Sequence, residues 1–525
     1  MADPDIHVIA RATDALAAAA VADLRARTRD GEAIDDHQVA VERVAYAVTE
    51  ARAIAELVRV ADVPGADVAA GELAISLRNR LEPILDADAA PYPAAARAAI
   101  ARAIAPAAVE ALGATALDAT GRLPWPHDDV LAEVRAQVRA FADREVAPIA
   151  ERLHRHDELV PDKLITAMGH AGYFGLSIPE SYGGHDLGNL AMIMTTEELS
   201  RASLAGAGSL ITRPEILAKA LLAGGTEDQK KRWLPRLASG EIMVAISVTE
   251  PDTGSDVASL RCAAEPVDGG YAITGAKAWC TFAGRADVIA LLARTSADGV
   301  SAGSRGLTLF VVDKPRFDGH DFEASQPGGG TLTGTADRTP GYRGMHSFSL
   351  RFDRWFVPAE QVVGGPAGVG RGFALQMAGF AAGRLQTGGR ACGVIGAALE
   401  HTAAYVLSRR QFGKPIGDYG LTRYYLGRMA GRLVAARALT YAAATAMDSD
   451  PAHAGTLAAM AKLFACDAAV EVTQLGQVLH GGWGYAEEYP ISRLVADAQV
   501  LPIFEGVRPI LALKVIGRAL ARGNE

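Results

Sequence analysis

Apolar residues recur three and four positions apart through most of the chain, and they alternate with polar residues in one central stretch. In residues 6–118, which are rich in alanine, the helical spacing is broken at Asp30-Gly31, Pro64-Gly65 and Pro91-Tyr92-Pro93. Because glycine and proline end helices, this pattern predicts a bundle of about four helices.

A linker is predicted at residues 121–126, where the two prolines on either side of Trp125 cannot lie inside a helix. A second helical region follows, and Thr226 suits an N-cap ahead of Glu227 and Asp228. The helices expected in this region cover residues 128–152, 161–171, 190–200 and 226–237.

The central stretch, residues 242–363, is rich in β-branched residues and in glycine. Such runs are typical of strands, which are expected at residues 243–248, 271–274, 288–292 and 307–312. The segment 326–341 is rich in glycine and threonine, and it is expected to be an inserted loop rather than a strand.

Helical spacing returns after Gly370 and predicts helices at about 371–410, 420–448, 453–480 and 508–522, with Pro509 in the first turn of the last one. The fold class is therefore α+β. The predicted domains are an N-terminal helical extension (1–121), an N-terminal α domain (122–241), a barrel-like middle β domain (242–363) and a C-terminal four-helix bundle (364–525).

With 525 residues, half of them hydrophobic, the chain is long enough to bury several cores. Its net charge of -9 and its scattered basic residues give no general attraction to nucleic acid or to an anionic membrane, so neither is an expected partner. The four cysteines are far apart without metal-ligand spacing, which predicts buried thiols, no metal site and a reducing, cytoplasmic location. Acidic residues near the start of the chain argue against a transit peptide.

A carboxylate near the C-terminus is the leading candidate for chemistry. Glu505 lies among Ile503, Phe504 and Val507, just before the last predicted helix. Burial of this turn would disfavour the ionised carboxylate and move its pKa towards the range that acid–base catalysis uses. Glu505 is therefore the candidate general base, and a solvated turn residue is the alternative.

Five motifs occur in order in the second to fourth domains: TEPDTGSD (249–256), WCT (279–281), RRQFGKP (409–415), HGGWGY (480–485) and FEG (504–506). Together they resemble the acyl-CoA dehydrogenases over residues 122–525. The resemblance implies that family's fold, FAD as the cofactor, an acyl-CoA substrate, electron-transfer flavoprotein as the electron acceptor, and a homodimer or homotetramer. The N-terminal extension lies outside the resemblance, and it is expected to cover a surface that other members use for tetramer assembly.

The resemblance also implies where FAD binds. The flavin ring would lie between the β domain and the C-terminal helices, with Thr281 donating to flavin N5 and Trp279 packing against the ring. Val248 and Thr249 would bond its pyrimidine edge. The remaining contacts are Arg409, Gln411 and Phe412 at the pyrophosphate and adenine of a neighbouring subunit, Gly481 and Gly482 where the backbone approaches closely, and Val478 where the family has a glutamine, with Gln477 one place away.

Glu505 matches the family's base, which removes the proton α to the thioester while a hydride leaves the β carbon for the flavin. The Glu505 N–H and a ribityl hydroxyl of the flavin would stabilise the thioester oxygen. Some members carry the base on an earlier helix, where this chain has Gly383, so Glu505 keeps the role. Val507 stands where the family has threonine, and one cofactor hydrogen bond is therefore expected to be absent or replaced.

Arg213 is expected at the bottom of the acyl pocket, where a guanidinium can bind a second carboxylate through two hydrogen bonds. Segments 341–347 and 379–390 further resemble the members that oxidise (2S)-methylsuccinyl-CoA to mesaconyl-CoA in the ethylmalonyl-CoA pathway. The substrate-binding residues implied are Ser255 for CoA, Thr212, Arg213 and His346 for the acyl group, and Arg384, Phe504 and Gly506 near the reacting atoms.

Several alternatives stay open. One is that Arg213 pairs with Glu215 or points to solvent. Another is that Arg384 and Arg390 are helix-surface or interface charges. The enzyme alternatives are another short-chain or glutaryl-type acyl-CoA dehydrogenase and a flavin oxidase on the same fold. A non-catalytic helical binding or assembly protein on the same scaffold is the alternative of a different class.

Overall fold

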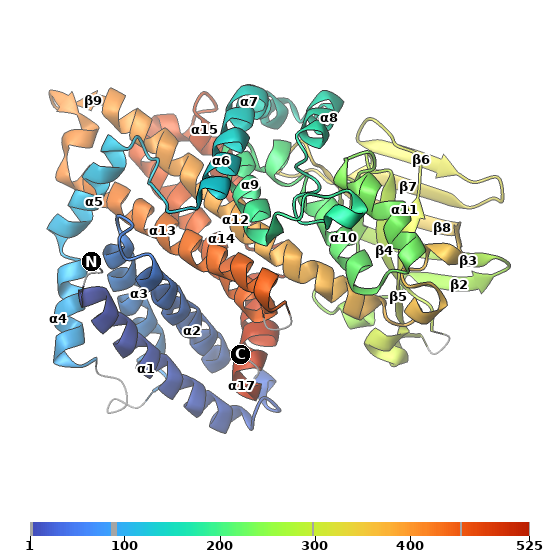
Figure 1. The fold of residues 1–525 in the computed structure, drawn as a ribbon, viewed down its shortest axis with the longest axis horizontal. Coiled ribbons are helices and arrows are strands. Elements are labelled where there is room, and N and C mark those ends of the chain that lie inside the picture. Colours follow the sequence, from blue (N-terminus) through green and yellow to red (C-terminus); the bar gives the residue numbers. More distant parts are fainter. Residues whose placement is uncertain (1–3, 86–91, 297–298, 452–453, 524–525) are drawn as a thin grey trace. The chain divides into compact units, whose positions relative to one another are not determined.

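The computed structural model describes residues 4–85, 92–296, 299–451 and 454–523, which form two compact units. The first, here called the helical unit, combines Met1–Val138 with Arg384–Glu525. The second, the mixed unit, is Arg139–Gly383 and contains the large β-sheet (Figure 1). The division into four domains at residues 121, 241 and 363 remains a prediction.

Among the described residues, the N-terminal part of the helical unit has five helices where about four were predicted. The extra break falls at Ala105, which is extended because it precedes Pro106, the first residue of the fifth helix. Two predicted breaks separate the first three helices, and Pro91 lies outside the described residues. The helices are α1 (Pro4–Thr28), α2 (Gln38–Arg59), α3 (Ala66–Leu81), α4 (Ala94–Ala103) and α5 (Pro106–Asp118).

Long helices form the C-terminal part of the helical unit, as predicted. In chain order the elements are α12 (Gly372–Ser408), which begins in the mixed unit, a hairpin of β9 (Arg410–Gln411) and β10 (Lys414–Pro415), α13 (Gly420–Ser449), α14 (Ala454–His480) and α15 (Pro490–Ala498). The last segment consists of α16 (Arg508–Ile510), a π-helical turn (Leu511–Gly517) and α17 (Arg518–Arg522). The short helix α15 was not predicted.

Two glycines let α5 and α13 cross at close range. A Cβ atom on Gly113 would lie 1.8 Å from the carbonyl oxygen of Arg423, and one on Gly427 would lie 2.0 Å from that of Val109. Interiors are close-packed, so any side chain at either position would force the helices apart. The N-terminal extension thus shares the core of the helical unit.

Among the helices of the described residues, α12 has the length and apolar composition of a membrane span, and the bent pair of α4 and α5 passes the same test if it is counted as one span. In the most apolar part of α12, 72% of the window is buried inside the protein. A buried core helix has this composition too.

The helical part of the mixed unit follows α6 (Asp129–Phe141), which belongs partly to each unit. Thr226 caps α11 as predicted, because its side chain accepts from the Gln229 N–H and the Gln229 side chain accepts from the Thr226 N–H. One helix, α10, was not predicted, since it is buried on nearly all sides and no polar stripe marks it. The helices are α7 (Ala147–His156), α8 (Asp162–His170), α9 (Gly188–Ala202), α10 (Thr212–Gly224) and α11 (Glu227–Ala238).

Eight strands form one mixed sheet in the order β1-β4-β2-β3-β8-β7-β6, with β5 paired to β4. Strands occupy all four of the β-branched runs, as predicted. Their bounds are β1 (Val244–Ser247), β2 (Ala263–Val267), β3 (Gly270–Thr281), β4 (Val288–Arg294), β5 (Leu307–Asp313), β6 (Asp321–Ser325), β7 (Thr331–Ala336) and β8 (Ser347–Pro358).

The prediction of a loop at residues 326–341 is wrong. β6 and β7 form an antiparallel hairpin, and β7 also pairs with β8. Gly334 lies opposite Phe322, and a Cβ atom on it would lie 2.3 Å from the Phe322 ring. This glycine therefore makes room for an aromatic side chain within a strand and does not indicate a loop.

The core of the mixed unit lies where α10 and α11 pack against β1, β4 and β5 (Figure 1). Its members are apolar and buried, and they include Leu217, Trp233, Val244, Leu292 and Val311. Burial of this face fixes the position of β1, which ends just before the TEPDTGSD motif.

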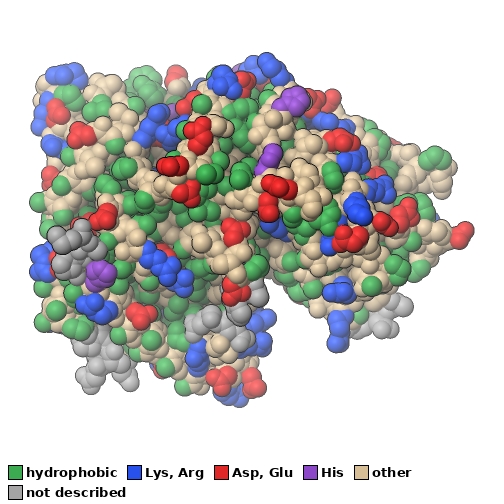
Figure 2. Space-filling view, in the orientation of Figure 1, with side chains coloured by type: hydrophobic (Ala, Val, Ile, Leu, Met, Phe, Trp, Pro, Cys, Tyr) green, Lys and Arg blue, Asp and Glu red, His purple; other side chains and the backbone are tan. Residues whose placement is uncertain are grey.

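The surface charges and the cysteines are arranged as expected from the sequence. Charged side chains of both signs are interspersed over the face shown in Figure 2. All four cysteines are free and buried, as predicted.

Candidate functional site

The predicted site residues are distributed over both units. In the mixed unit they lie at the ends of β1 and β3, at the start of α10 and just before β8. In the helical unit they lie on α12, around the β9–β10 hairpin, at the end of α14 and in the turn before α16.

A buried ion pair holds the segment that leaves β1. The Lys277 ammonium lies 3.0 Å from the Glu250 carboxylate and donates a hydrogen bond to the Val248 carbonyl. The same carboxylate accepts from the backbone N–H groups of residues 261–262, at 2.8 Å each. Removing either partner would leave an uncompensated buried charge, so the pair fixes the backbone at Val248 and Thr249. Sequence reasoning gave Lys277 no role.

The ends of β1 and β3 lie next to each other. The Thr249 carbonyl accepts a hydrogen bond from the Ala278 N–H at 2.9 Å. Val248 is buried and Thr249 is half-buried, whereas Ser255 is exposed in the turn that follows. The predicted contact between Ser255 and CoA stays a prediction.

Trp279 and Thr281, from the WCT motif, occupy different environments. The pairing of β3 with β8 shifts register between Lys277 and Cys280, and Trp279 has a left-handed backbone with a φ of 58°. Trp279 is 59% exposed, while Thr281 is buried and shares a 3.0 Å hydrogen bond with Ser347. Trp279 therefore offers an open aromatic surface, and Thr281 offers a hydroxyl group in a fixed place.

Arg213 is buried at the start of α10, so the alternative that it points to solvent is wrong. The side chain is 5% exposed, and its Nη2 donates to the Tyr342 hydroxyl at 3.4 Å. The nearby Glu215 carboxylate accepts from the Ser177 hydroxyl at 2.6 Å and lies 3.5 Å from the Lys219 ammonium. The adjacent Thr212 is also fully buried.

His346 was predicted to contact the acyl group, and the structure gives it protein partners. Its Nε2 lies 3.1 Å from the Asp157 carboxylate, and its ring centre lies 4.5 Å from that of His320. Tyr342, four residues earlier in the same segment, is the residue that reaches Arg213. A role for His346 in direct substrate contact remains a prediction.

The turn that carries Glu505 has two consecutive left-handed residues, with a φ of 53° at Glu505 and 101° at Gly506. Such a backbone at a residue with a side chain costs roughly 1–3 kcal/mol and concentrates at functional sites. A Cβ atom on Gly506 would lie 2.8 Å from Leu511, which also favours glycine there. Glu505 is half-buried, so its predicted removal from water is partial.

Two cations act on this turn. Lys462 on α14 is fully buried, and its ammonium donates a 2.8 Å hydrogen bond to the Gly506 carbonyl. Burial lowers the pKa of Lys462, while the neighbouring Cys466 and Glu505 oppose that shift. Burial likewise lowers the pKa of Arg384, and attraction to Glu505 opposes it. The Lys462 hydrogen bond therefore holds the turn, and Arg384 is attracted to the Glu505 carboxylate.

Arg390 is not a helix-surface charge, so that alternative is wrong for this residue. It is fully buried, and its guanidinium carbon lies 4.6 Å from the centre of the Phe504 ring. A desolvated guanidinium over an aromatic ring is a favourable contact. Arg390 thereby holds Phe504, the residue just before Glu505.

The residues predicted to bind the distal part of the cofactor lie at adjoining ends of α12 and α14. The Tyr405 ring stacks on the His480 ring at 4.2 Å, and its hydroxyl donates to the His480 carbonyl, which joins the two helix ends. The predicted residues on these ends are Arg409, Gln411, Phe412, Val478, Gly481 and Gly482. Phe412 is 95% and Val478 72% exposed, and a Cβ atom on Gly481 or Gly482 would meet nothing within 4 Å.

The HGGWGY motif is stabilised from within. The Gln477 side chain donates to the Gly484 carbonyl at 3.0 Å, so Gln477 holds the turn. A cofactor contact at Val478 stays a prediction. His480 is buried with its Nδ1 2.7 Å from the Gly476 carbonyl, and burial lowers its pKa. His480 therefore makes a buried hydrogen bond within its own helix and helps to hold the end of α14.

The N-terminal extension reaches the segment that follows the Glu505 turn. Tyr46 on α2 donates to the Asp467 carboxylate on α14 at 2.8 Å, and Arg508 lies 3.0 Å from the same carboxylate. Burial raises the pKa of Tyr46, so its hydroxyl stays protonated and remains a donor. Arg508 is three residues after Glu505, and the extension thus restrains the chain on one side of the turn.

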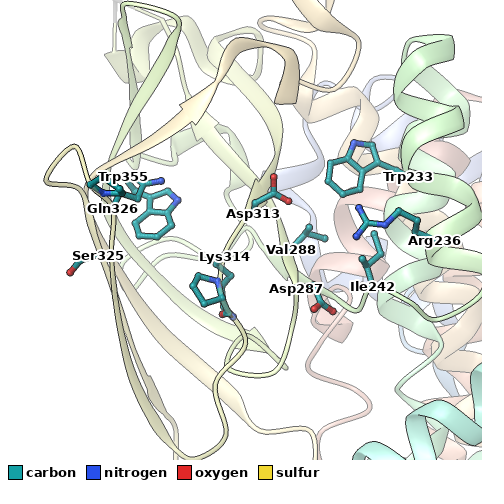
Figure 3. Close-up of a pocket in the computed structure, with 12 residues that line it drawn as sticks. Trp233, Arg236, Ile242, Asp287, Val288, Asp313, Lys314, Ser325, Gln326 and Trp355 are labelled. Atoms are coloured by element: carbon teal, nitrogen blue, oxygen red, sulfur yellow. The ribbon is translucent and has the colours of Figure 1, made fainter.

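An open pocket of about 390 Å³ also lies in the mixed unit, and none of the predicted site residues lines it (Figure 3). Its lining includes Trp233, Lys314 and Trp355. The Lys314 ammonium donates to three backbone carbonyls, and burial lowers its pKa to about 8. Because the Lys314 ammonium is already bonded to backbone carbonyls, and because no predicted site residue lines the pocket, the pocket is not the candidate site.

Comparison with known proteins agrees with this arrangement. Three domain models match in chain order: the acyl-CoA dehydrogenase N-terminal domain over residues 129–241, the middle domain over 245–355 and the C-terminal domain over 370–521. The chain is 42% identical over 394 residues to a (2S)-methylsuccinyl-CoA dehydrogenase of Cereibacter sphaeroides, and the match covers 75% of this chain and 70% of that protein.

Two solved structures are similar in fold. A glutaryl-coenzyme A dehydrogenase in complex with glutaryl-CoA has a TM-score of 0.69 at 31% identity, covering 77% of this chain and 97% of that one. A structure of the electron transferring flavoprotein of Acidaminococcus fermentans has a TM-score of 0.69 at 28% identity, covering 75% of this chain and 98% of the matched one.

Proposed function

Since the chain belongs to the acyl-CoA dehydrogenase family, whose members are FAD-dependent oxidoreductases, we propose that it oxidises (2S)-methylsuccinyl-CoA to mesaconyl-CoA. The observation that carries this choice is the buried guanidinium of Arg213 beside the Tyr342 hydroxyl. A fatty acyl chain offers no acceptor to that cation, whereas the free carboxylate of a dicarboxylic acyl group does. The 42% identity with the Cereibacter sphaeroides protein supports the same substrate.

The exposed residues fit the cofactor that the family binds. Trp279 presents an open indole on which a planar aromatic ring can stack. Gly481 and Gly482 leave space at the backbone, and the Arg409 guanidinium suits paired phosphate oxygens. An additional aromatic surface comes from Phe412. These are the features that a bound dinucleotide needs.

When bound, FAD would supply the acceptor for the hydride that leaves the β carbon of the acyl group. The protein itself takes the α proton, and Glu505 is the residue that accepts it. Its carboxylate lies in a strained turn that is flanked by cations. The electron pair of the broken Cα–H bond forms the new double bond as the hydride departs. Lys462 and Arg390 keep the carboxylate in place through the neighbouring residues.

Further parts of the proposal concern partners. We assign electron-transfer flavoprotein as the electron acceptor, the ethylmalonyl-CoA pathway as the setting and the cytoplasm as the location. A homo-oligomer is supported by the exposed hydrophobic side chains of Phe412, Val478 and Tyr485, because large apolar groups at the surface favour contact with another chain.

A glutaryl-type dehydrogenase is the second candidate. It is favoured by the fold similarity to the glutaryl-CoA complex. The free carboxylate of a glutaryl group also carries the same negative charge as that of a methylsuccinyl group, so Arg213 could bind either. The two substrates differ in chain length and branching, so activity separates them.

Anaerobic titration of the purified flavoprotein with methylsuccinyl-CoA, glutaryl-CoA and 2-methylbutyryl-CoA tests the proposal. The absorbance of oxidised flavin should disappear fastest with methylsuccinyl-CoA. Faster reduction by glutaryl-CoA would favour the second candidate. In a separate aerobic assay, oxygen consumption without an added acceptor would indicate an oxidase. If none of the three thioesters reduces the flavin, the proposed substrate and the second candidate are both excluded.

A further inference from the structure

Two histidines and a carboxylate meet in the mixed unit, where α7 ends and where β6 and β8 begin. Asp157, His320 and His346 each present one ligand atom, and these atoms all lie within 4.8 Å of one another. Among them, His346 Nε2 and Asp157 Oδ1 are 3.1 Å apart. We propose that this cluster binds a divalent transition-metal ion with the preferences of Zn²⁺.

The spacing suits a tetrahedral ion. With metal–ligand bonds of about 2.1 Å, neighbouring ligand atoms of a tetrahedral zinc site are about 3.4 Å apart. The pair formed by His346 and Asp157 is already close to that separation. The ligand atoms are at most 4.8 Å apart, so His320 has to move by at most about 1.4 Å to reach the tetrahedral spacing. Its exposed side chain can turn that far. Three protein ligands leave the fourth position to water.

Two of the three ligands sit on a fixed and strained backbone. Asp157 ends α7 with a φ of 54°, and its N–H is bonded to the Leu153 carbonyl. His346 has a φ of 45°, and its carbonyl accepts from the Phe282 N–H at 2.8 Å. Left-handed residues other than glycine cost energy and concentrate at functional sites. The backbone therefore holds both side chains where an ion can join them.

The donor set selects the kind of ion. Imidazole nitrogens suit zinc and its neighbours in the periodic table, whereas magnesium and calcium prefer oxygen ligands. Arg343 lies 3.6 Å from the same Asp157 oxygen, so an ion bound there would share this oxygen with the guanidinium.

Such an ion would fasten a segment that contacts predicted active-site residues on both sides of His346. Tyr342 accepts a hydrogen bond from Arg213, and Ser347 is bonded to Thr281. The role of the ion is therefore structural. His346 acts on the acyl pocket through the position of Tyr342, and this last step rests on the proposed function.

The sequence predicted no metal site because the ligands come from three distant segments and none of them is a cysteine. The cluster becomes visible when α7, the start of β6 and the start of β8 are folded together. The spacing of these residues along the chain does not reveal that they meet in the folded protein.

Zinc binding by the full-length FAD-loaded protein, prepared without a histidine tag and stripped with a chelator, tests the proposal. Equilibrium dialysis against ZnCl₂ should give one zinc per chain, with no competition from excess Mg²⁺. His320→Ala should weaken binding at least about 100-fold, more than the loss of an outer contact. His170→Ala, which changes an exposed histidine at the end of α8, should bind zinc like the wild type.

Melting temperatures give a second readout. Zinc should raise the melting temperature of the wild type and of His170→Ala, but not that of His320→Ala. Because His320 is exposed, its replacement should leave the metal-free melting temperature unchanged. Equal zinc binding by wild type and His320→Ala, or a wild type that takes up no zinc, would overturn the proposal. No substrate is present, so the outcome is independent of which acyl-CoA the enzyme oxidises.

Discussion

Replacing Arg213 with methionine should move the enzyme from a dicarboxylic substrate towards an uncharged one. Arg213 is 5% exposed, and its guanidinium donates to the Tyr342 hydroxyl. A substrate carboxylate that pairs with it is therefore removed from water as well. Methionine keeps much of the length of the side chain and removes the charge, so Arg213→Met tests the cation rather than the volume.

The magnitude follows from the burial of the pair. Truncating one partner of a buried, hydrogen-bonded charge pair costs about 2–5 kcal/mol. A loss of about 3–4 kcal/mol corresponds to a fall of about 100- to 1,000-fold in kcat/KM for methylsuccinyl-CoA. 2-Methylbutyryl-CoA carries a methyl group in place of the carboxylate. Its kcat/KM should stay the same or rise, because the variant no longer buries a cation opposite an apolar group.

Steady-state oxidation of both thioesters, with electron-transfer flavoprotein as the acceptor, measures the effect. Arg213→Lys is the matched control: it keeps the charge without the planar fork, and it should lose less activity on methylsuccinyl-CoA than Arg213→Met does. An unchanged melting temperature verifies folding. Equal losses on the charged and the uncharged thioester would refute a carboxylate-binding role for Arg213.

Three further substitutions test how the site is held. Lys462→Met removes the donor to the Gly506 carbonyl; kcat for flavin reduction should fall about 10- to 100-fold, since a hydrogen bond to a charged group is worth about 1.5–3 kcal/mol, and an unchanged kcat would exclude a positioning role. Tyr46→Phe removes the hydrogen bond to Asp467 and should lower the free energy of unfolding by about 1 kcal/mol in denaturant titrations, with FAD content unchanged. Thr226→Ala removes the cap of α11 and should destabilise by about 1 kcal/mol without changing kcat; a large loss of activity would show that this helix end does more than cap.

The parts of the fold that could be predicted are those in which periodicity and burial agree. The long helices α12, α13 and α14 repeat apolar residues at helical spacing, and strands occupy the β-branched runs. α10 was missed because it is buried on nearly all sides and lacks a polar stripe. β7 was missed because Gly334 makes room for Phe322, a reason that exists only after the strands pair.

The site divides in the same way. Motif residues such as Thr249, Thr281 and Glu505 could be named because short segments carry them. Lys277 and Lys462 could not, since each interacts with a backbone carbonyl far along the chain, 29 and 44 residues away. The sequence does not show which group a charged residue in an apolar segment will bind. The contribution of a buried cation to stability depends on that group.

The rate of anaerobic flavin reduction by methylsuccinyl-CoA in wild type and in Glu505→Gln tests the central claim most directly. Glutamine preserves the shape of the side chain and cannot take the α proton. The variant should purify with FAD and bind the thioester, and its flavin should be reduced about 100- to 10,000-fold more slowly than in the wild type. Reduction at the wild-type rate would contradict the assignment of Glu505 as the base.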